Sequence, residues 1–140
     1  MPPEANFKSW LTGRVPKHWH CQTIETTTGR GIPDLNICND AGEMWLEIKA
    51  AHKRPHLRPE QYAWISRRHA CGGKAFVLHR CDEDIFTWAI YGPPNWETRV
   101  SGSYVEIISP PMAQGQGIQP LIITLLDLQH GRNPTTTPWD

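Results

Sequence analysis

The chain has 140 residues, with 39% hydrophobic and 20% charged residues and a formal net charge of zero. This length and composition are typical of one globular domain and exclude an intrinsically disordered chain. No apolar run approaches the roughly 20 residues of a membrane-spanning helix, and the N-terminus lacks the regions of a secretion signal, so we expect a cytoplasmic protein.

The first half of the chain predicts a short helix, a strand and a hairpin. Apolar residues recur at helical spacing between residues 4 and 12, so we expect a helix there. Residues 18–27 alternate imperfectly between apolar and polar and predict a first strand. Apolar runs at 35–38 and 44–50 flank the turn-forming sequence Asn-Asp-Ala-Gly and predict a hairpin.

A basic loop at 51–56 precedes a second predicted helix. Pro59 suits the first turn of a helix, and two glycines near residue 72 are a normal stop signal, so we expect the helix to end at about Cys71. Residues 74–79 and 85–91 predict strands. A helix that crosses the sheet lets strand 74–79 lie parallel to strand 44–50.

The last third of the chain is rich in proline and glycine, which break regular elements. Residues 105–108 predict one more strand, and 115–117 predict a loop. Residues 120–129 are apolar enough to be either a terminal helix or a buried strand. We therefore expect one domain over 1–132, followed by a flexible tail at 133–140.

Three charged side chains are spaced so that neighbouring strands can bring them together. Glu47 and Lys49 are two residues apart and share a face of a strand, and Asp34 precedes the adjoining apolar run. Two converging carboxylates can hold a hard divalent cation, and an ammonium beside them can stabilise charge on a phosphate. Taken singly, each residue fits a turn or an exposed charge pair better than a site, but taken together with Gln61 and the basic loop they favour a nuclease site.

This pattern resembles that of a known nuclease superfamily. Pro33-Asp34 followed by Glu47-Ile48-Lys49 is similar to the PD-(D/E)xK signature, and residues 57–65 look like the helix after the catalytic strand in VRR-NUC nucleases and archaeal-type Holliday junction resolvases. The resemblance covers residues 4–91, leaving 92–132 as an extension. It implies an α/β restriction-endonuclease-like core, with a central mixed sheet of about four to five strands flanked by helices.

The resemblance also implies roles for individual residues. Asp34 and Glu47 would bind Mg²⁺, which Mn²⁺ can replace, together with the backbone carbonyl of Ile48. The other implied catalytic residues are Lys49 and Gln61, the latter matching a glutamine that points back into the site. Members of the superfamily often carry a further metal-binding glutamate on a first helix. Glu4 and Glu25 compete for that role in this chain.

Charge is distributed unevenly along the sequence. Residues 48–81 hold eight basic and one acidic side chains, whereas the segments on either side are net acidic. A basic segment beside the predicted site is typical of phosphate contacts, although solvated surface charge is the simpler alternative. The candidate DNA-binding residues are Arg30, Lys53, Arg54, Arg58, Arg67 and Arg68.

Other residues allow weaker interpretations. The polar loop before Gly31 either contacts a phosphate or forms a plain turn. Four cysteines without C-x-x-C spacing do not favour a zinc site. Four histidines in the basic segment either touch phosphate or serve ordinary surface and packing roles: His52, His56, His69 and His79.

The function implied by the resemblance is a Mg²⁺-dependent, structure-selective endodeoxyribonuclease. Its substrate would be branched DNA of the Holliday junction or flap type, in DNA recombination or repair, and small stand-alone members of this type are often encoded by phages. Junction cleavage needs two coordinated cuts, which implies a homodimer. The alternatives are a restriction-like nuclease and a non-cleaving DNA-binding or assembly protein on the same fold.

Overall fold

The computed structural model describes residues 3–25, 30–80 and 87–134. Three helices and nine strands occur in these ranges. Their bounds in chain order are α1 Pro3–Thr12, β1 His20–Thr23, β2 Leu35–Asn39, β3 Gly42–Lys49, β4 His56–Leu57, α2 Pro59–Ala70, β5 Ala75–His79, β6 Thr87–Tyr91, β7 Thr98–Ser101, β8 Tyr104–Ile107, β9 Ala113–Gln116 and α3 Ile118–Gln129.

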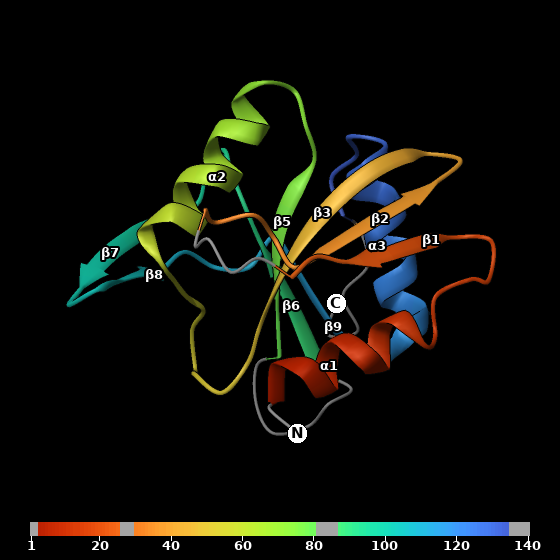
Figure 1. Cartoon of the computed structure of the whole chain (residues 1–140), viewed down its shortest axis with the longest axis horizontal. Helices are drawn as coiled ribbons and strands as arrows, with labels where there is room; N and C mark the ends of the chain where they lie inside the picture. The colour runs from red at the N-terminus through yellow and green to blue at the C-terminus, as the bar shows by residue number, and fades with distance from the viewer. Residues whose placement is uncertain (1–2, 26–29, 81–86, 135–140) are drawn as a thin grey trace.

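The central sheet is mixed, as predicted. Its strand order is β1-β2-β3-β5-β6-β9 (Figure 1), and β3 and β5 are parallel while all other neighbours are antiparallel. The helix α2 connects the parallel pair, as such a crossover requires. The predicted α/β architecture of a mixed sheet flanked by helices is therefore confirmed.

The described sheet has six strands rather than the four to five that we predicted. The additional strand is β9, which pairs with β6 at the sheet edge and places Gly115 opposite Trp88. The sequence predicts a loop at 115–117, because a glycine-rich stretch without apolar alternation carries no local strand signal. The pairing partner β6 lies more than twenty positions earlier in the sequence, so the strand depends on tertiary contacts.

The two faces of the sheet carry separate hydrophobic cores. Helices α1 and α3 cover one face, where Leu46 and Ile48 of β3 are fully buried. Helix α2 covers the other face, where Ile65 packs on strands β5 and β6. Burial of apolar surface on both faces stabilises the sheet, and it leaves the strand ends between the helices free to carry polar groups.

The apolar segment after Gly117 forms the helix α3, which decides between the two interpretations that the sequence left open. Its buried side chains Leu121, Leu125 and Leu128 recur at helical spacing. Pro120 lies in the first turn, where a helix tolerates proline. The indole Nε1 of Trp88 donates a hydrogen bond of 2.8 Å to the carbonyl of Gly117, which ties the helix start to the sheet.

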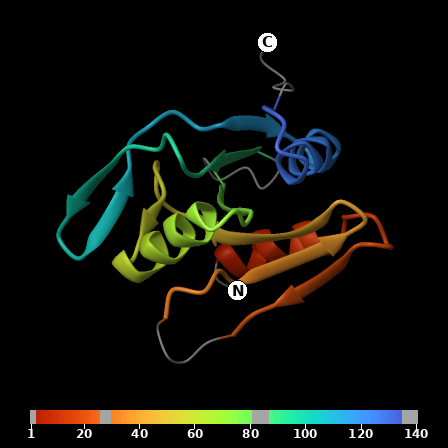
Figure 2. The ribbon, with the colours of Figure 1, turned by 90° about the horizontal axis from the view of Figure 1, so that it is seen from above.

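A second, three-stranded sheet has the order β4-β8-β7. Figures 1 and 2 show its β7–β8 hairpin extending away from the central sheet, next to α2. The sequence predicted only the strand at 105–108, because β4 has two residues and β7 is mostly exposed. No helix in the described part of the chain is long and apolar enough to cross a bilayer.

Candidate active site

Asp34 directly precedes β2, beside the end of β3. The strand register pairs Leu35 with Leu46, which places Asp34 next to the last residues of β3. Its Oδ1 accepts a hydrogen bond of 3.0 Å from the backbone N–H of Ile48. Its own backbone carbonyl accepts a 2.9 Å bond from Ile24. These two bonds hold the carboxylate of Asp34 at the junction of the two strands.

Glu47 and Lys49 share the face of β3 that lies toward α2, because side chains alternate along a strand. Only 4% of Glu47 is exposed, although it is a charged residue type. The ammonium Nζ of Lys49 lies 3.5 Å from Glu47 Oε2. The end of β3 therefore brings a buried carboxylate and an ammonium together, next to Asp34.

Gln61 reaches this group from the first turn of α2. Its amide Nε2 donates a hydrogen bond of 3.0 Å to Glu47 Oε2, and its Oε1 accepts a 2.9 Å bond from the backbone N–H of Arg58. One amide therefore caps the helix start and orients a carboxylate at the same time. The side chain is buried, which fixes this orientation.

Gly31 sets the position of α2 relative to the strand that carries Asp34. Its φ of 79° lies in the left-handed region that favours glycine. A Cβ at this position would overlap the backbone carbonyl of Glu60 and would lie 2.8 Å from the backbone nitrogen of Gln61. The loop backbone and the first turn of α2 touch directly, so only glycine fits here.

These residues line one open pocket of about 500 Å³. Glu4 of α1 and Glu25 both line it, so the structure brings together both of the glutamates that competed in the sequence. Arg58 also lines the pocket. The complete lining is Glu4, Ile24, Glu25, Ile32, Asp34, Glu47, Lys49, Arg58 and Gln61.

The other predicted DNA-binding residues lie outside this pocket. Arg30, Lys53 and Arg54 are exposed, and the guanidinium of Arg54 donates a 2.6 Å hydrogen bond to the carbonyl of Ile108 at the end of the small sheet. Arg67 and Arg68 line a second pocket at the far end of α2. Residues 26–29 of the predicted phosphate loop are outside the described residues.

The electrostatics of the site raise the pKa of both of its central acids. Burial, together with the negative charge of Asp34, raises the pKa of Glu47 to about 8, against the opposing effect of Lys49. Burial also raises the pKa of Asp34, while the Ile48 N–H bond and the charge of Lys8 oppose the rise. The positive charge near the two acids is therefore too small for both to ionise together. A bound cation would supply the missing charge.

The donor set fits a hard divalent cation. Within the described residues, no group of three or more His, Cys, Asp or Glu side chains is arranged to hold a metal, but two carboxylates and a backbone carbonyl supply oxygens of the kind that Mg²⁺ prefers. The Lys49 carbonyl accepts a 3.0 Å bond from Arg80, beyond the end of β5. Backbone groups of successive strand residues point in opposite directions, so the Ile48 carbonyl faces β2 and Asp34.

The four histidines of the basic segment do not line the site pocket. His79 is fully buried in β5, and this burial lowers its pKa to about 4. The rings of His52 and His56 stack with their centroids 4.1 Å apart, and His56 Nε2 lies 3.8 Å from Glu106. Of the two interpretations, these three side chains fit the packing role.

Sequence reasoning missed two residues that shape the site. Lys8 lies four residues after Glu4 on α1, and its charge acts on Asp34. The i, i+4 spacing puts both on one face of the helix, which is the signal that identifies Lys8. The close approach of Gly31 to α2 carries no sequence signal, because it depends on where the helix packs.

No protein-family model and no curated protein sequence matches this chain. A solved structure does match: Hjc of Archaeoglobus fulgidus, described as a Holliday junction resolvase from an archaeal hyperthermophile, with 14% sequence identity and a TM-score of 0.52. The match covers 74% of this chain and 84% of Hjc. The chain therefore has the restriction-endonuclease-like α/β fold of Hjc, as the sequence resemblance predicted.

Proposed function

We propose that this protein, which has the fold of Hjc, is a Mg²⁺-dependent endodeoxyribonuclease that hydrolyses phosphodiester bonds in branched DNA. One observation carries the proposal: the carboxylates of Asp34 and Glu47 converge in an open pocket beside the ammonium of Lys49. The fold supports nuclease chemistry. The resolvase description of Hjc, together with the sequence resemblance, supports a branched substrate such as a Holliday junction or a flap.

Asp34, Glu47 and the Ile48 carbonyl would hold the metal ion, since all three supply oxygen. When bound, Mg²⁺ neutralises charge on the scissile phosphate and lowers the pKa of a water ligand, and Mn²⁺ can do the same. Glu4 and Glu25 at the pocket wall are placed to accept hydrogen bonds from further water molecules. The chain thus supplies the acidic side chains that the proposed metal site needs.

Lys49 supplies positive charge directly beside Glu47. Water attacks phosphorus and one P–O bond to a sugar breaks, so negative charge gathers on the non-bridging oxygens. The ammonium of Lys49 stabilises that charge or orients the attacking water. Gln61 is a positioning residue, because its bond to Glu47 Oε2 holds the carboxylate that Lys49 contacts.

DNA is the proposed partner, bound by the basic segment around the pocket. Arg58 lies at the pocket wall, while Arg30, Lys53 and Arg54 are exposed and would contact phosphates farther along the strand. Two coordinated cuts in a junction imply a two-fold homodimer. Between the alternatives, the presence of both acids and Lys49 favours a cutting protein over a non-cleaving DNA-binding protein.

The test is a substrate panel of four-way junction, flap, linear duplex and single strand, each with Mg²⁺, Mn²⁺ or EDTA. We expect cleavage of the branched substrates with either metal and none in EDTA. Asp34→Asn and Lys49→Ala should retain DNA binding and lose cleavage by about 100-fold or more, as for other preorganised charge-stabilising groups.

Asp127→Asn is the matched control for charge removal, since Asp127 pairs with Arg132 on the α3 side of the molecule. It should cut like the unmodified protein. Undiminished cleavage by Asp34→Asn, or cleavage in EDTA, would reject the proposed site. Equal cutting of duplex and junction would reject the structure selectivity alone.

A further inference from the structure

One face of α2 leads from the candidate active site to a second pocket. Gln61, Trp64 and Arg68 follow at i, i+3 and i+7, so they lie along the same side of the helix. Gln61 binds Glu47. One turn later the Trp64 ring lies 5.4 Å from the ring of Trp45, in an edge-to-face arrangement. Trp45 and Glu47 share a face of β3, so the two places lie on the same side of the sheet.

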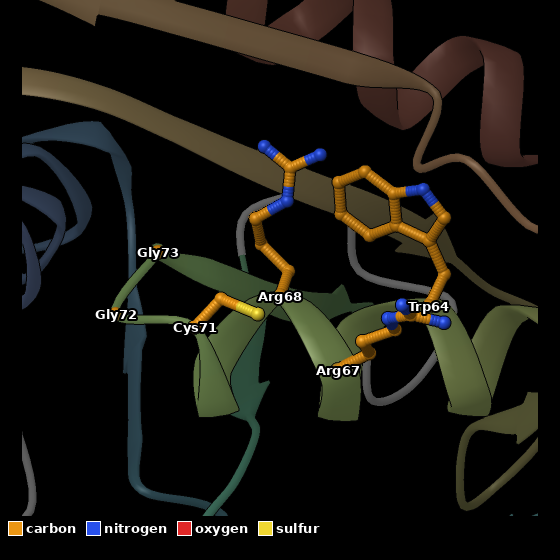
Figure 3. Close-up of a pocket in the computed structure, with 6 residues that line it drawn as sticks. All are labelled: Trp64, Arg67, Arg68, Cys71, Gly72 and Gly73. Carbon is orange, nitrogen blue, oxygen red and sulfur yellow. The ribbon is translucent and has the colours of Figure 1, made fainter.

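The second pocket, here called the Trp64 pocket, lies at the C-terminal end of α2. Figure 3 shows the side chains of Trp64 and Arg68 extending from the helix in the same direction, with the Cys71–Gly73 turn beside them. The pocket has a volume of about 590 Å³, which is in the range of sites for small molecules. Its lining is Trp64, Arg67, Arg68, Cys71, Gly72 and Gly73.

The Trp64 pocket combines aromatic surface with unbalanced positive charge. The guanidinium of Arg68 lies 4.4 Å from the ring centre of Trp64 and 5.8 Å from that of Trp45. Among the described residues, no carboxylate lies within ion-pair distance of Arg67 or Arg68. Two guanidinium groups without an acidic partner, beside an indole, suit a ligand that is both aromatic and anionic.

Gly73 allows the Arg68 side chain to take this position. A Cβ on Gly73 would lie 2.5 Å from Arg68 Cδ and 3.1 Å from the Arg68 backbone carbonyl. The stem of Arg68 therefore runs against the bare backbone of the turn that ends the helix. Placement of the guanidinium over Trp64 depends on this close approach, so the turn is part of the pocket.

We propose that the Trp64 pocket binds an unpaired nucleotide of the branched DNA, an inference that rests on the proposed nuclease function. The base would stack on the surface formed by Trp64 and Arg68, and the guanidinium groups of Arg67 and Arg68 would bind its phosphate. Aromatic rings and guanidinium planes bind bases that have left the helical stack. In an intact duplex, both faces of each base are covered by neighbouring bases. A pocket for duplex phosphates alone would need no indole.

The distance along α2 places this nucleotide relative to the cut. Seven residues separate Gln61 from Arg68, which corresponds to about 10 Å of helix. Neighbouring nucleotides of a strand are about 3.4 Å apart along the DNA axis. The unpaired base would therefore lie roughly three nucleotides along the strand from the phosphate beside Lys49.

The test compares binding of a fluorescein-labelled flap and a linear duplex of the same sequence, measured by fluorescence anisotropy in EDTA so that cleavage plays no part. We expect Trp64→Leu to weaken flap binding roughly tenfold, the usual effect of losing one stacking contact, and to weaken duplex binding by less than about twofold. Trp64→Phe keeps an aromatic face and should restore most of the loss. The matched control is Arg14→Gln, which removes an arginine from above another tryptophan, Trp10, at 5.6 Å on α1.

A second series leaves the protein unchanged and moves an abasic site along the unpaired arm. One position, about three nucleotides from the cut, should weaken binding by the unmodified protein as much as Trp64→Leu does, and the variant should be insensitive to it. If Trp64→Leu fails to fold, this series decides the question alone.

Equal losses on flap and duplex would show a phosphate contact only and would overturn the proposal, as would an abasic series without a sensitive position. Failure of the proposed function would give a different result: the unmodified protein would not cut DNA and would bind branched DNA no better than duplex.

Discussion

The two faces of the eight-residue strand β3 have different roles: one is apolar and packs in the core, and the other carries the charged groups of the candidate site. On the face toward α1 and α3, Leu46 and Ile48 are fully buried among apolar side chains. On the face toward α2, Glu47 is almost as deeply buried but lies among charged and polar groups. Burial of the first kind stabilises the fold, and burial of the second kind opposes ionisation. Because successive side chains of a strand point to opposite faces, a residue that stabilises the core and a residue of the candidate site can be direct neighbours in the sequence.

The largest expected effect on stability comes from the apolar face. Leu46→Ala should lower the free energy of unfolding by about 2–5 kcal/mol, because it removes a fully buried side chain and leaves a cavity. Urea denaturation measures this change. Ile123→Ala, at a side chain that is 48% exposed on α3, should change the same quantity by less than about 0.5 kcal/mol. A similar loss in both variants would show that the apolar face of β3 is not a packed core.

At the neighbouring residue, we expect the substitution Glu47→Gln to reduce activity rather than stability. We expect cleavage to fall by about 100-fold or more, while the metal-free protein becomes less sensitive to pH. The folded-state pKa of Glu47, at about 8, lies above its ordinary value of 4.5. Its contribution to stability is therefore complete below pH 4.5 and is lost as the pH rises through 8.

Urea denaturation in EDTA across this pH range measures the difference. The unmodified protein should lose stability toward alkaline pH, and Glu47→Gln should remove most of that slope. An unchanged slope in the variant would mean that the two acids do not share a buried site. Addition of Mg²⁺ at alkaline pH should restore stability to the unmodified protein only.

The smallest expected effect is that of replacing Gln61, at the start of α2. Gln61→Leu should lower cleavage by roughly 10- to 100-fold, as removal of a group that orients a metal ligand does, with a stability loss of about 1 kcal/mol from the helix start. Gln22→Leu, the same exchange at an exposed residue of β1, should change neither. A loss of stability without a loss of activity would make Gln61 a helix cap alone.

Local patterns predicted the elements that carry the acids. The hairpin, the crossover helix and the parallel pairing of 44–50 with 74–79 follow from apolar runs, turn residues and helix signals, and the structure has all three. The relative placement of Glu47 and Lys49 follows from strand alternation alone. The roles that the sequence assigned to these residues stay predictions until cleavage is measured.

The remaining features depend on contacts between distant segments. Strands β4 and β9 are short, and each is defined by a partner far away in sequence. The apolar composition of 120–129 fits helix and buried strand alike, so only packing on the sheet decides between them. The stack of Arg68 on Trp64 and Trp45 joins α2 to β3, and no periodicity within either segment reveals it.

The contact between Gly31 and the first turn of α2 has a consequence for comparing this chain with its relatives. Because two backbones touch there, a methyl group at position 31 would push the glutamine and the acids apart without altering any charged residue. Under the proposed nuclease function, a homologue that keeps every acid but carries alanine at this point should cut DNA poorly. An uncharged position would then report loss of the proposed activity as well as the two acids do.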